Sequence, residues 1–162
     1  MINLEKLYFY QKQLDDEIAI KHNVSYETTF EKRLLSLLVE IGELANETRC
    51  FKYWSNKGPS PKEIVMDEYA DGLHFFLSLG IPLKTDKYIY EINSNNVSLV
   101  EQFHKLYALI TSLKDNYCLK DYQIAFQYYL NLAVSLSMSE EDIISSYMKK
   151  LQVNHHRQET NY

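Results

Sequence analysis

The sequence predicts an all-α fold, a bundle of five to six helices that forms one domain over residues 1–162. Three observations predict it. With only 4 glycines and 3 prolines, the chain has too few turn residues for the many short connections of an all-β or a doubly wound α/β fold. Apolar residues recur at helical spacing over most of its length. No internal repeat, low-complexity stretch or Pro/Gly/Ser-rich linker divides it.

The first two helices are expected in the N-terminal third of the chain. One runs from about Leu4 to Ala19, and Asn3 is placed to cap it. The other runs from about Glu27 to Phe51. Its apolar stripe has the helical period and consists of Phe30, Leu34, Leu37, Leu38, Ile41, Leu44, Ala45 and Thr48.

The third helix has the clearest start signal. Ser60–Glu63 reads Ser-Pro-Lys-Glu, a capping box with proline at the first helical position. Gly80 and Pro82 are expected to end this helix. The following stretch, Lys84–Asn96, is expected to be irregular or a short helix. Tyr88, Tyr90 and Ile92 alternate as in a strand, but one short strand has no evident partner in an all-α chain.

Two or three helices complete the C-terminal half. Ser98–Glu101 is a second capping box and begins the fourth helix. A fifth helix is expected from about Asp121 to Leu136, followed by a break at Ser137–Ser139. The last helix carries Ile143, Ile144, Tyr147, Met148 and Leu151 on its apolar side.

The charge and composition of the chain disfavour several classes of protein. The net charge of −5 argues against a surface that coats nucleic acid, so no direct nucleic-acid partner is expected. No apolar run approaches the roughly 20 residues that span a bilayer, and no secretory signal is evident at the N-terminus. The two cysteines are too few for a disulfide framework. These features favour a cytoplasmic protein without a membrane partner.

Two pairs of acidic residues lie beside the apolar stripes of the second and third predicted helices. Glu40 and Glu43 flank the apolar side of the second helix, and Glu68 and Asp71 share the core side of the third. If the helices pack side by side, these four carboxylates converge. Clustered anions in a partly dry cleft take up protons or bind cations. All-oxygen ligation suits Mg²⁺, or alternatively Mn²⁺.

The same acidic residues are also compatible with a solvent-exposed helix face, because surface helices are often rich in glutamate. From spacing alone, a metal site and a solvated acidic face are about equally well supported. Asp67 is expected in solvent, and Glu47 is expected in solvent or in a salt bridge with Arg49 or Lys52. His74 lies one turn past Asp71, so iron is disfavoured although not excluded.

The C-terminus is basic in an otherwise acidic chain. Lys150, Asn154 and Arg157 fall on one helical face. Arginine offers bidentate donors to phosphate, and lysine a mobile charge. An acidic metal site with a separate basic cluster is what a nucleoside polyphosphate requires. The alternative is a basic helix end that the helix dipole favours and solvent surrounds.

These motifs resemble the MazG-like, all-α nucleoside triphosphate pyrophosphatases, and more closely the dimeric, all-α dUTP diphosphatases. Three stretches carry the closer resemblance: Glu40–Glu47 running into Phe51–Trp54, then Asp67–Phe75, and the tail with Lys150, Asn154, Arg157 and Tyr162. The Gln11–Asp15 segment also resembles the part of the first helix that holds the nucleoside. Together they cover nearly the whole chain.

The resemblance implies a homodimer with a shared active site that hydrolyses dUTP, and also dUDP, to dUMP. Glu40, Glu43, Glu68 and Asp71 would bind Mg²⁺, with Glu43 and Glu40 as catalytic residues that act on water. The phosphates would be held by Lys150, Asn154, Arg157 and Tyr162. The base and sugar would lie near Gln11, Asp15, Trp54 and Phe75.

Two residues depart from the family pattern. Asn161 stands where the family commonly has glycine before its final tyrosine, and asparagine tolerates positive φ better than most residues. Asp15 stands where some relatives have asparagine. Phe75 could pack in the core instead of stacking on the base, and His74 could be an ordinary buried histidine. Two other functions stay open: a pyrophosphatase acting on dCTP or another nucleotide, and a non-catalytic interaction domain.

Overall fold

The computed structural model describes residues 1–162 and consists of six helices and two very short strands. The helices are α1 (Glu5–His22), α2 (Tyr26–Thr48), α3 (Lys62–Gly80), α4 (Leu99–Ser112), α5 (Leu119–Ser135) and α6 (Glu140–Glu159). The strands are β1 (Ile2–Asn3) and β2 (Ile89–Tyr90). The all-α fold predicted from the sequence is confirmed. No helix combines the length and the apolar character that crossing a membrane requires.

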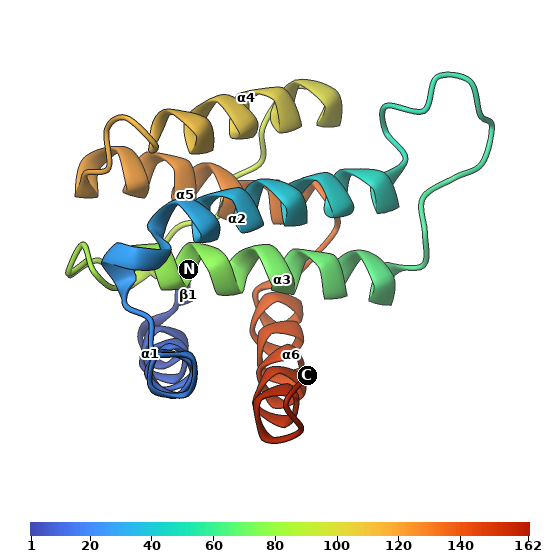
Figure 1. The fold of residues 1–162 in the computed structure, drawn as a ribbon. Helices are drawn as coiled ribbons and strands as arrows, with labels where there is room; N and C mark the ends of the chain where they lie inside the picture. Colours follow the sequence, from blue (N-terminus) through green and yellow to red (C-terminus); the bar gives the residue numbers. More distant parts are fainter.

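Helix α3 is the centre of the bundle. It packs against α1, α2, α5 and α6, and the remaining helix, α4, packs on α2 and α5. In Figure 1, α2, α3, α4 and α5 run across the view, whereas α1 and α6 are seen end-on below α3. The pair formed by α1 and α6 therefore crosses the other helices steeply. Residues from α1, α2 and α6 can meet along α3, and the candidate site lies there.

The N-terminal caps follow the sequence in one predicted case and differ in two. Leu4, and not Asn3, occupies the N-cap position of α1, although the side-chain oxygen of Asn3 accepts from the backbone N–H of Glu5 at 2.9 Å. The capping box at Ser98 is confirmed: its hydroxyl accepts from the backbone N–H of Glu101, whose carboxylate accepts from the backbone N–H of Ser98. The capping box predicted at Ser60 is wrong. Pro61 occupies the N-cap position of α3, and the Ser60 hydroxyl donates instead to the Glu47 carboxylate. This tertiary contact also replaces the salt bridge or solvent expected for Glu47.

The stretch from Lys84 to Asn96 contains a strand that the sequence analysis did not assign. Ile89 and Tyr90 pair antiparallel with Asn3 and Ile2. The backbone N–H of Leu4 extends the pairing by donating to the Tyr88 carbonyl at 2.9 Å. The prediction that a strand here has no partner is wrong, because the partner strand is only two residues long and too short to show alternation in the sequence.

Two glycines of α3 allow α5 to approach closely. A Cβ atom at Gly72 would lie 2.5 Å from the Tyr129 hydroxyl oxygen. That hydroxyl donates to the backbone carbonyl of Tyr69, and the Tyr69 hydroxyl donates in return to the carbonyl of Tyr129 at 3.2 Å. Gly80 accommodates the Tyr122 hydroxyl in the same way. These contacts fix the turn of α3 that carries Glu68 and Asp71.

Candidate active site

Three acidic side chains meet where α2 packs against α3. Glu40 of α2 and Glu68 and Asp71 of α3 each offer a carboxylate oxygen, and these oxygens all lie within 4.8 Å of one another. All three residues are half-buried. The fourth predicted ligand, Glu43, is exposed and lies outside this group of three, although its side chain contacts that of Glu40.

The surroundings of the three acids disfavour three negative charges. Burial raises the pKa of Glu40 to about 8, helped by its hydrogen bond with Glu43 and by the nearby charges of Asp71 and Glu68. Burial also raises the pKa of Glu68 and of Asp71. One carboxylate oxygen, Oε2 of Glu40, is buried without a hydrogen-bond partner. An unpartnered buried oxygen among clustered acids fits a divalent cation such as Mg²⁺ or Mn²⁺, because these ions take oxygen ligands.

Lys150 joins α6 to these acids. Its side chain is buried, and its ammonium group donates to Oδ2 of Asp67 and to Oδ2 of Asp71, both at 2.7 Å. Burial alone would lower the pKa of Lys150, but the two carboxylates raise it overall, so the residue stays charged. The expectation that Asp67 is merely solvated is wrong: its side chain is 48% exposed but binds this ammonium group.

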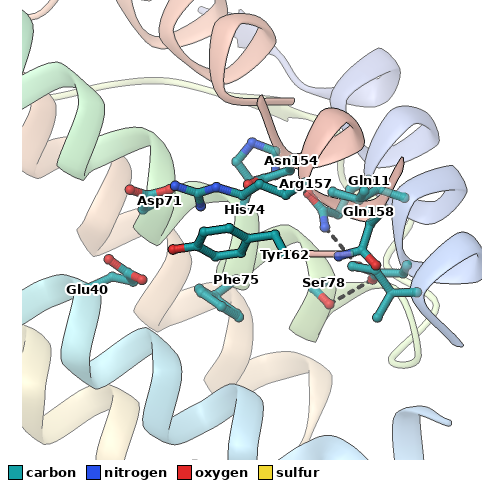
Figure 2. Close-up of a pocket in the computed structure, with 13 residues that line it drawn as sticks. Gln11, Glu40, Asp71, His74, Phe75, Ser78, Asn154, Arg157, Gln158 and Tyr162 are labelled. Carbon is teal, nitrogen blue, oxygen red and sulfur yellow. Dashed lines mark hydrogen bonds between the residues drawn. The ribbon is translucent and has the colours of Figure 1, made fainter. Parts of the chain in front are cut away.

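A cavity of about 280 Å³ extends from the acidic cluster along α3. Figure 2 shows Glu40 and Asp71 at one end and Gln11 and Ser78 at the other, with the Tyr162 ring between them. The lining comes from four helices and the C-terminus. It consists of Gln11, Leu14, Asp15, Ile18, Glu40, Asp71, His74, Phe75, Ser78, Asn154, Arg157, Gln158 and Tyr162.

The C-terminal residues close one side of this cavity. Asn161 adopts a left-handed backbone conformation with φ of 56°, which lets an asparagine replace the glycine of the family pattern. The turn brings the backbone N–H of Tyr162 to the carbonyl of Arg157 at 3.0 Å. The Arg157 guanidinium lies 4.8 Å from the centre of the Tyr162 ring. The basic end of α6 therefore folds over the cavity.

At the other end of the cavity, buried polar groups satisfy one another. The Gln11 carbonyl oxygen lies 2.6 Å from Nδ1 of His74, and its amide nitrogen donates to Asp15 at 2.9 Å. The His74 ring stacks on Tyr147, with ring centres 4.1 Å apart. Burial lowers the pKa of His74 to about 3, so this imidazole is neutral at physiological pH.

A family model described as dUTPase matches residues 3–162, almost the whole chain. The chain belongs to the dUTPase family. It is therefore an enzyme that hydrolyses dUTP, and the family resemblance seen in its three motifs is confirmed. None of the curated proteins compared with it matches significantly.

Among the residues predicted to surround the base in this dUTPase, three line the cavity and one does not. Gln11, Asp15 and Phe75 are lining residues, and Phe75 also packs against the apolar core. Trp54 lies in the loop between α2 and α3 and is 64% exposed. This loop projects away from the rest of the chain in Figure 1. One chain by itself does not bring Trp54 to the cavity.

Several lining residues were not singled out from the sequence. Ser78 follows His74 by four residues and Asp71 by seven, so it lies on the same face of α3. Its place in the helical period could have identified it. Ile18 follows Leu14 by four residues and Gln11 by seven, and Gln158 follows Asn154 by four, so the helical period also places these two residues on the faces of α1 and α6 that line the cavity.

Proposed function

We propose that this dUTPase catalyses the divalent-cation-dependent hydrolysis of dUTP to dUMP and pyrophosphate, and that it also accepts dUDP. Removal of dUTP from the nucleotide pool keeps uracil out of DNA, and we infer that the enzyme works in the cytoplasm, where that pool is used. One observation carries the proposal: a single cavity has an acidic cluster at one end, a basic helix end beside it, and buried amide and hydroxyl groups at the far end.

The acidic cluster is the proposed cation site. Glu40, Glu68 and Asp71 hold Mg²⁺, or Mn²⁺ in its place, and Glu43 completes the set from the exposed side of α2. When bound, the ion supplies positive charge to phosphate oxygens and makes a water molecule more acidic. The orphaned Oε2 of Glu40 supports this assignment, since a buried carboxylate oxygen without a partner is costly.

Glu43 is the proposed general base, and Glu40 assists it. Glu43 is exposed, so water can reach its carboxylate, and it lies against Glu40. The carboxylate accepts a proton from the attacking water, whose oxygen forms a bond to the β-phosphorus. The bond between that phosphorus and the oxygen bridging to the α-phosphate breaks, and the oxygen leaves with dUMP. Pyrophosphate is the other product.

Four residues near the end of the chain are the proposed phosphate contacts. Arg157 and Tyr162 line the cavity together with Asn154. Lys150 lies deeper, against Asp67 and Asp71, and supplies a fixed positive charge close to the acidic cluster. Charge that develops on the phosphoryl oxygens is stabilised by Arg157 and Lys150.

The exposed aromatic loop supports a homodimer with a shared active site. Tyr53 and Trp54 are 94% and 64% exposed, and such large rings on a projecting loop favour burial against a partner. We propose that Trp54 contacts the nucleoside bound by the other subunit, whereas Gln11, Asp15 and Phe75 act within one chain.

A substrate panel tests the proposed function. The purified protein is incubated with dUTP, dUDP, dCTP, dTTP and UTP in the presence of Mg²⁺, and the products are identified. Fast conversion of dUTP to dUMP and pyrophosphate is the expected result. Preference for dCTP would make the enzyme a related pyrophosphatase. A calorimetric titration with Mg²⁺ and a non-hydrolysable dUTP analogue that shows no binding would instead favour an interaction domain.

A further inference from the structure

We infer that Lys150 is the built-in counter-cation of the acidic cluster in the nucleotide-free enzyme, and that its charge lowers the affinity of the cluster for a free divalent cation. Asp67 is the positioning residue in this arrangement, because it shares the Lys150 ammonium group with Asp71. This role rests on the proposed function, since the divalent cation is the one proposed there. It goes further by making cation binding depend on whether phosphates have taken up the charge of Lys150.

The charge of Lys150 lies inside the interface between α3 and α6. Its side chain is buried, and its ammonium group donates to Oδ2 of Asp67 and to Oδ2 of Asp71, each at 2.7 Å. The preceding residue on α6, Lys149, is exposed. Charges that are shielded from water interact more strongly than exposed ones. The charge of Lys150 therefore acts on the acidic cluster, whereas that of Lys149 is screened.

One carboxylate of the cluster is shared between the ammonium group and the proposed cation. Asp71 belongs to the three acids whose oxygens lie within 4.8 Å of one another, and it is the only one of the three that forms an ion pair with a lysine or arginine. Two positive groups at one carboxylate repel each other. Lys150 thus compensates part of the negative charge when no cation is bound, and it opposes the cation when one arrives.

Asp67 and Lys150 should act on cation binding in opposite directions. Asp67 lies one helical turn before Asp71 and outside the group of three acids. Without Asp67, the ammonium group pairs with Asp71 alone and opposes the cation more strongly. Without Lys150, this opposition is gone and the cation binds more tightly. A purely structural role of the two residues would instead weaken cation binding in both cases.

Bound phosphates should relieve the opposition. Lys150 shares one face of α6 with Asn154 and Arg157, which line the cavity. Phosphates that pair with this face bring negative charge to the ammonium group and offset its effect on the cation. Cation and polyphosphate therefore strengthen each other's binding, and by linkage the effect is reciprocal. The enzyme takes up its cation chiefly together with the nucleotide.

Calorimetric titration of Mg²⁺ into the nucleotide-free protein, at fixed pH and ionic strength, tests the inference. Lys150→Met should lower the Mg²⁺ dissociation constant by about fivefold or more, because it removes a buried charge beside the site. Asp67→Asn should raise this constant. Lys149→Met and Glu63→Gln are the matched controls, because they make the same changes of charge at exposed positions, and both should stay within about twofold of the wild type.

Lys150→Met should keep the packing of α6. Methionine retains an unbranched apolar side chain, Tyr147 and Leu151 are buried on the same side of the helix, and Lys62 pairs with Asp142 of the first turn at 2.8 Å. Circular dichroism checks the fold, and Lys150→Gln carries the same test if the methionine variant does not fold. Unchanged or weaker Mg²⁺ binding in the folded variant would overturn the inference.

A second titration measures the coupling to phosphate. With a saturating non-hydrolysable dUTP analogue, and with concentrations expressed as free Mg²⁺, the wild type should gain more Mg²⁺ affinity than Lys150→Met gains. An equal gain in both would contradict the coupling.

Hydrolysis of dUTP by the wild type tests the proposed function separately. An enzyme that hydrolyses dUTP, but whose Mg²⁺ affinity is the same in Lys150→Met, contradicts only the inference. Opposite shifts of the Mg²⁺ dissociation constant in Lys150→Met and Asp67→Asn, in a protein that does not hydrolyse dUTP, would support the inference and overturn the proposed function.

Discussion

The ammonium group of Lys150 lies 2.7 Å from Oδ2 of Asp71, and this ion pair links the basic end of α6 to the acidic cluster on α3. The side chain of Lys150 is 7% exposed and that of Asp71 is 21% exposed, so water screens the pair only in part. Asp71 is therefore paired with this ammonium group, and it is also one of the three carboxylates that would hold a divalent cation.

Lys150→Ala should destabilise the protein without a divalent cation. The substitution leaves Asp71 and Asp67 without their shared cation, and for a partly exposed network we expect a loss of about 1–3 kcal/mol in the free energy of unfolding. Urea denaturation measures it. The exposed neighbour Lys149 provides the matched control, since Lys149→Ala should have little effect. Equal stability of the two variants would show that the ion pairs of Lys150 contribute nothing to the free energy of unfolding.

The acidic cluster predicts a particular pH dependence of stability in the absence of divalent cations. Because the pKa of folded Glu40 is raised to about 8 from a reference of 4.5, the folded state binds more protons than the unfolded state between these values. The free energy of unfolding should thus fall as the pH rises from about 5 to about 8. Glu40→Gln should weaken this fall, because the amide does not titrate. A decline of the same size in Glu40→Gln would contradict the assignment.

The same proton coupling should appear in cation binding. Mg²⁺ binds the ionised carboxylates, so it must displace the proton from Glu40 below about pH 8. Calorimetry in two buffers of different ionisation enthalpy should detect proton release at pH 7 and much less at pH 9. Proton release that does not change with pH would argue that Glu40 is not a ligand.

Glu43→Gln should abolish turnover while the helical fold is preserved. The amide cannot accept the proton of the attacking water, and the side chain is exposed, so its loss should not disturb packing. Steady-state hydrolysis of dUTP and circular dichroism measure the two effects. Glu63→Gln, at an exposed acid in the first turn of α3, serves as control. If Glu43→Gln retains a tenth or more of the wild-type rate, Glu43 is not the general base.

Arg157→Ala should weaken nucleotide binding. Loss of a charged hydrogen bond to phosphate is expected to cost about 1.5–3 kcal/mol, and the Tyr162 ring also loses its cationic neighbour. Calorimetric titration with a non-hydrolysable dUTP analogue measures the change. Arg157→Lys should recover part of it, because the charge remains but the bidentate geometry does not. Unchanged affinity of Arg157→Ala for the dUTP analogue would show that Arg157 does not contact the phosphates.

Much of the fold follows from local patterns in the sequence. The helical period fixes the faces of α2 and α3, and Glu40, Glu68 and Asp71 meet because each adjoins the apolar stripe by which these helices pack. The breaks at Gly80 and at Ser137 also follow from local signals; Ser137 ends its helix in a left-handed conformation with φ of 57°.

The remaining features depend on contacts between distant segments. Ser60 has the sequence of a helix cap, but Glu47, thirteen residues earlier, takes its hydroxyl. Asp67 lies away from the core-facing side of α3, and only the packing of α6 against α3 brings Lys150 to it. The strand at Ile89–Tyr90 needs the N-terminal residues as its partner. Helical periodicity describes one element at a time and contains no information on such contacts.

We propose that Glu40, Glu68 and Asp71 hold a divalent cation that dUTP hydrolysis requires. Calorimetric titration of Mg²⁺ into wild-type protein and into Asp71→Asn, paired with dUTP hydrolysis in both, tests it most directly. A cation site at these three acids predicts saturable binding and conversion to dUMP in the wild type, and loss of both in a folded variant. Undiminished Mg²⁺ binding and dUTP turnover in Asp71→Asn would contradict it.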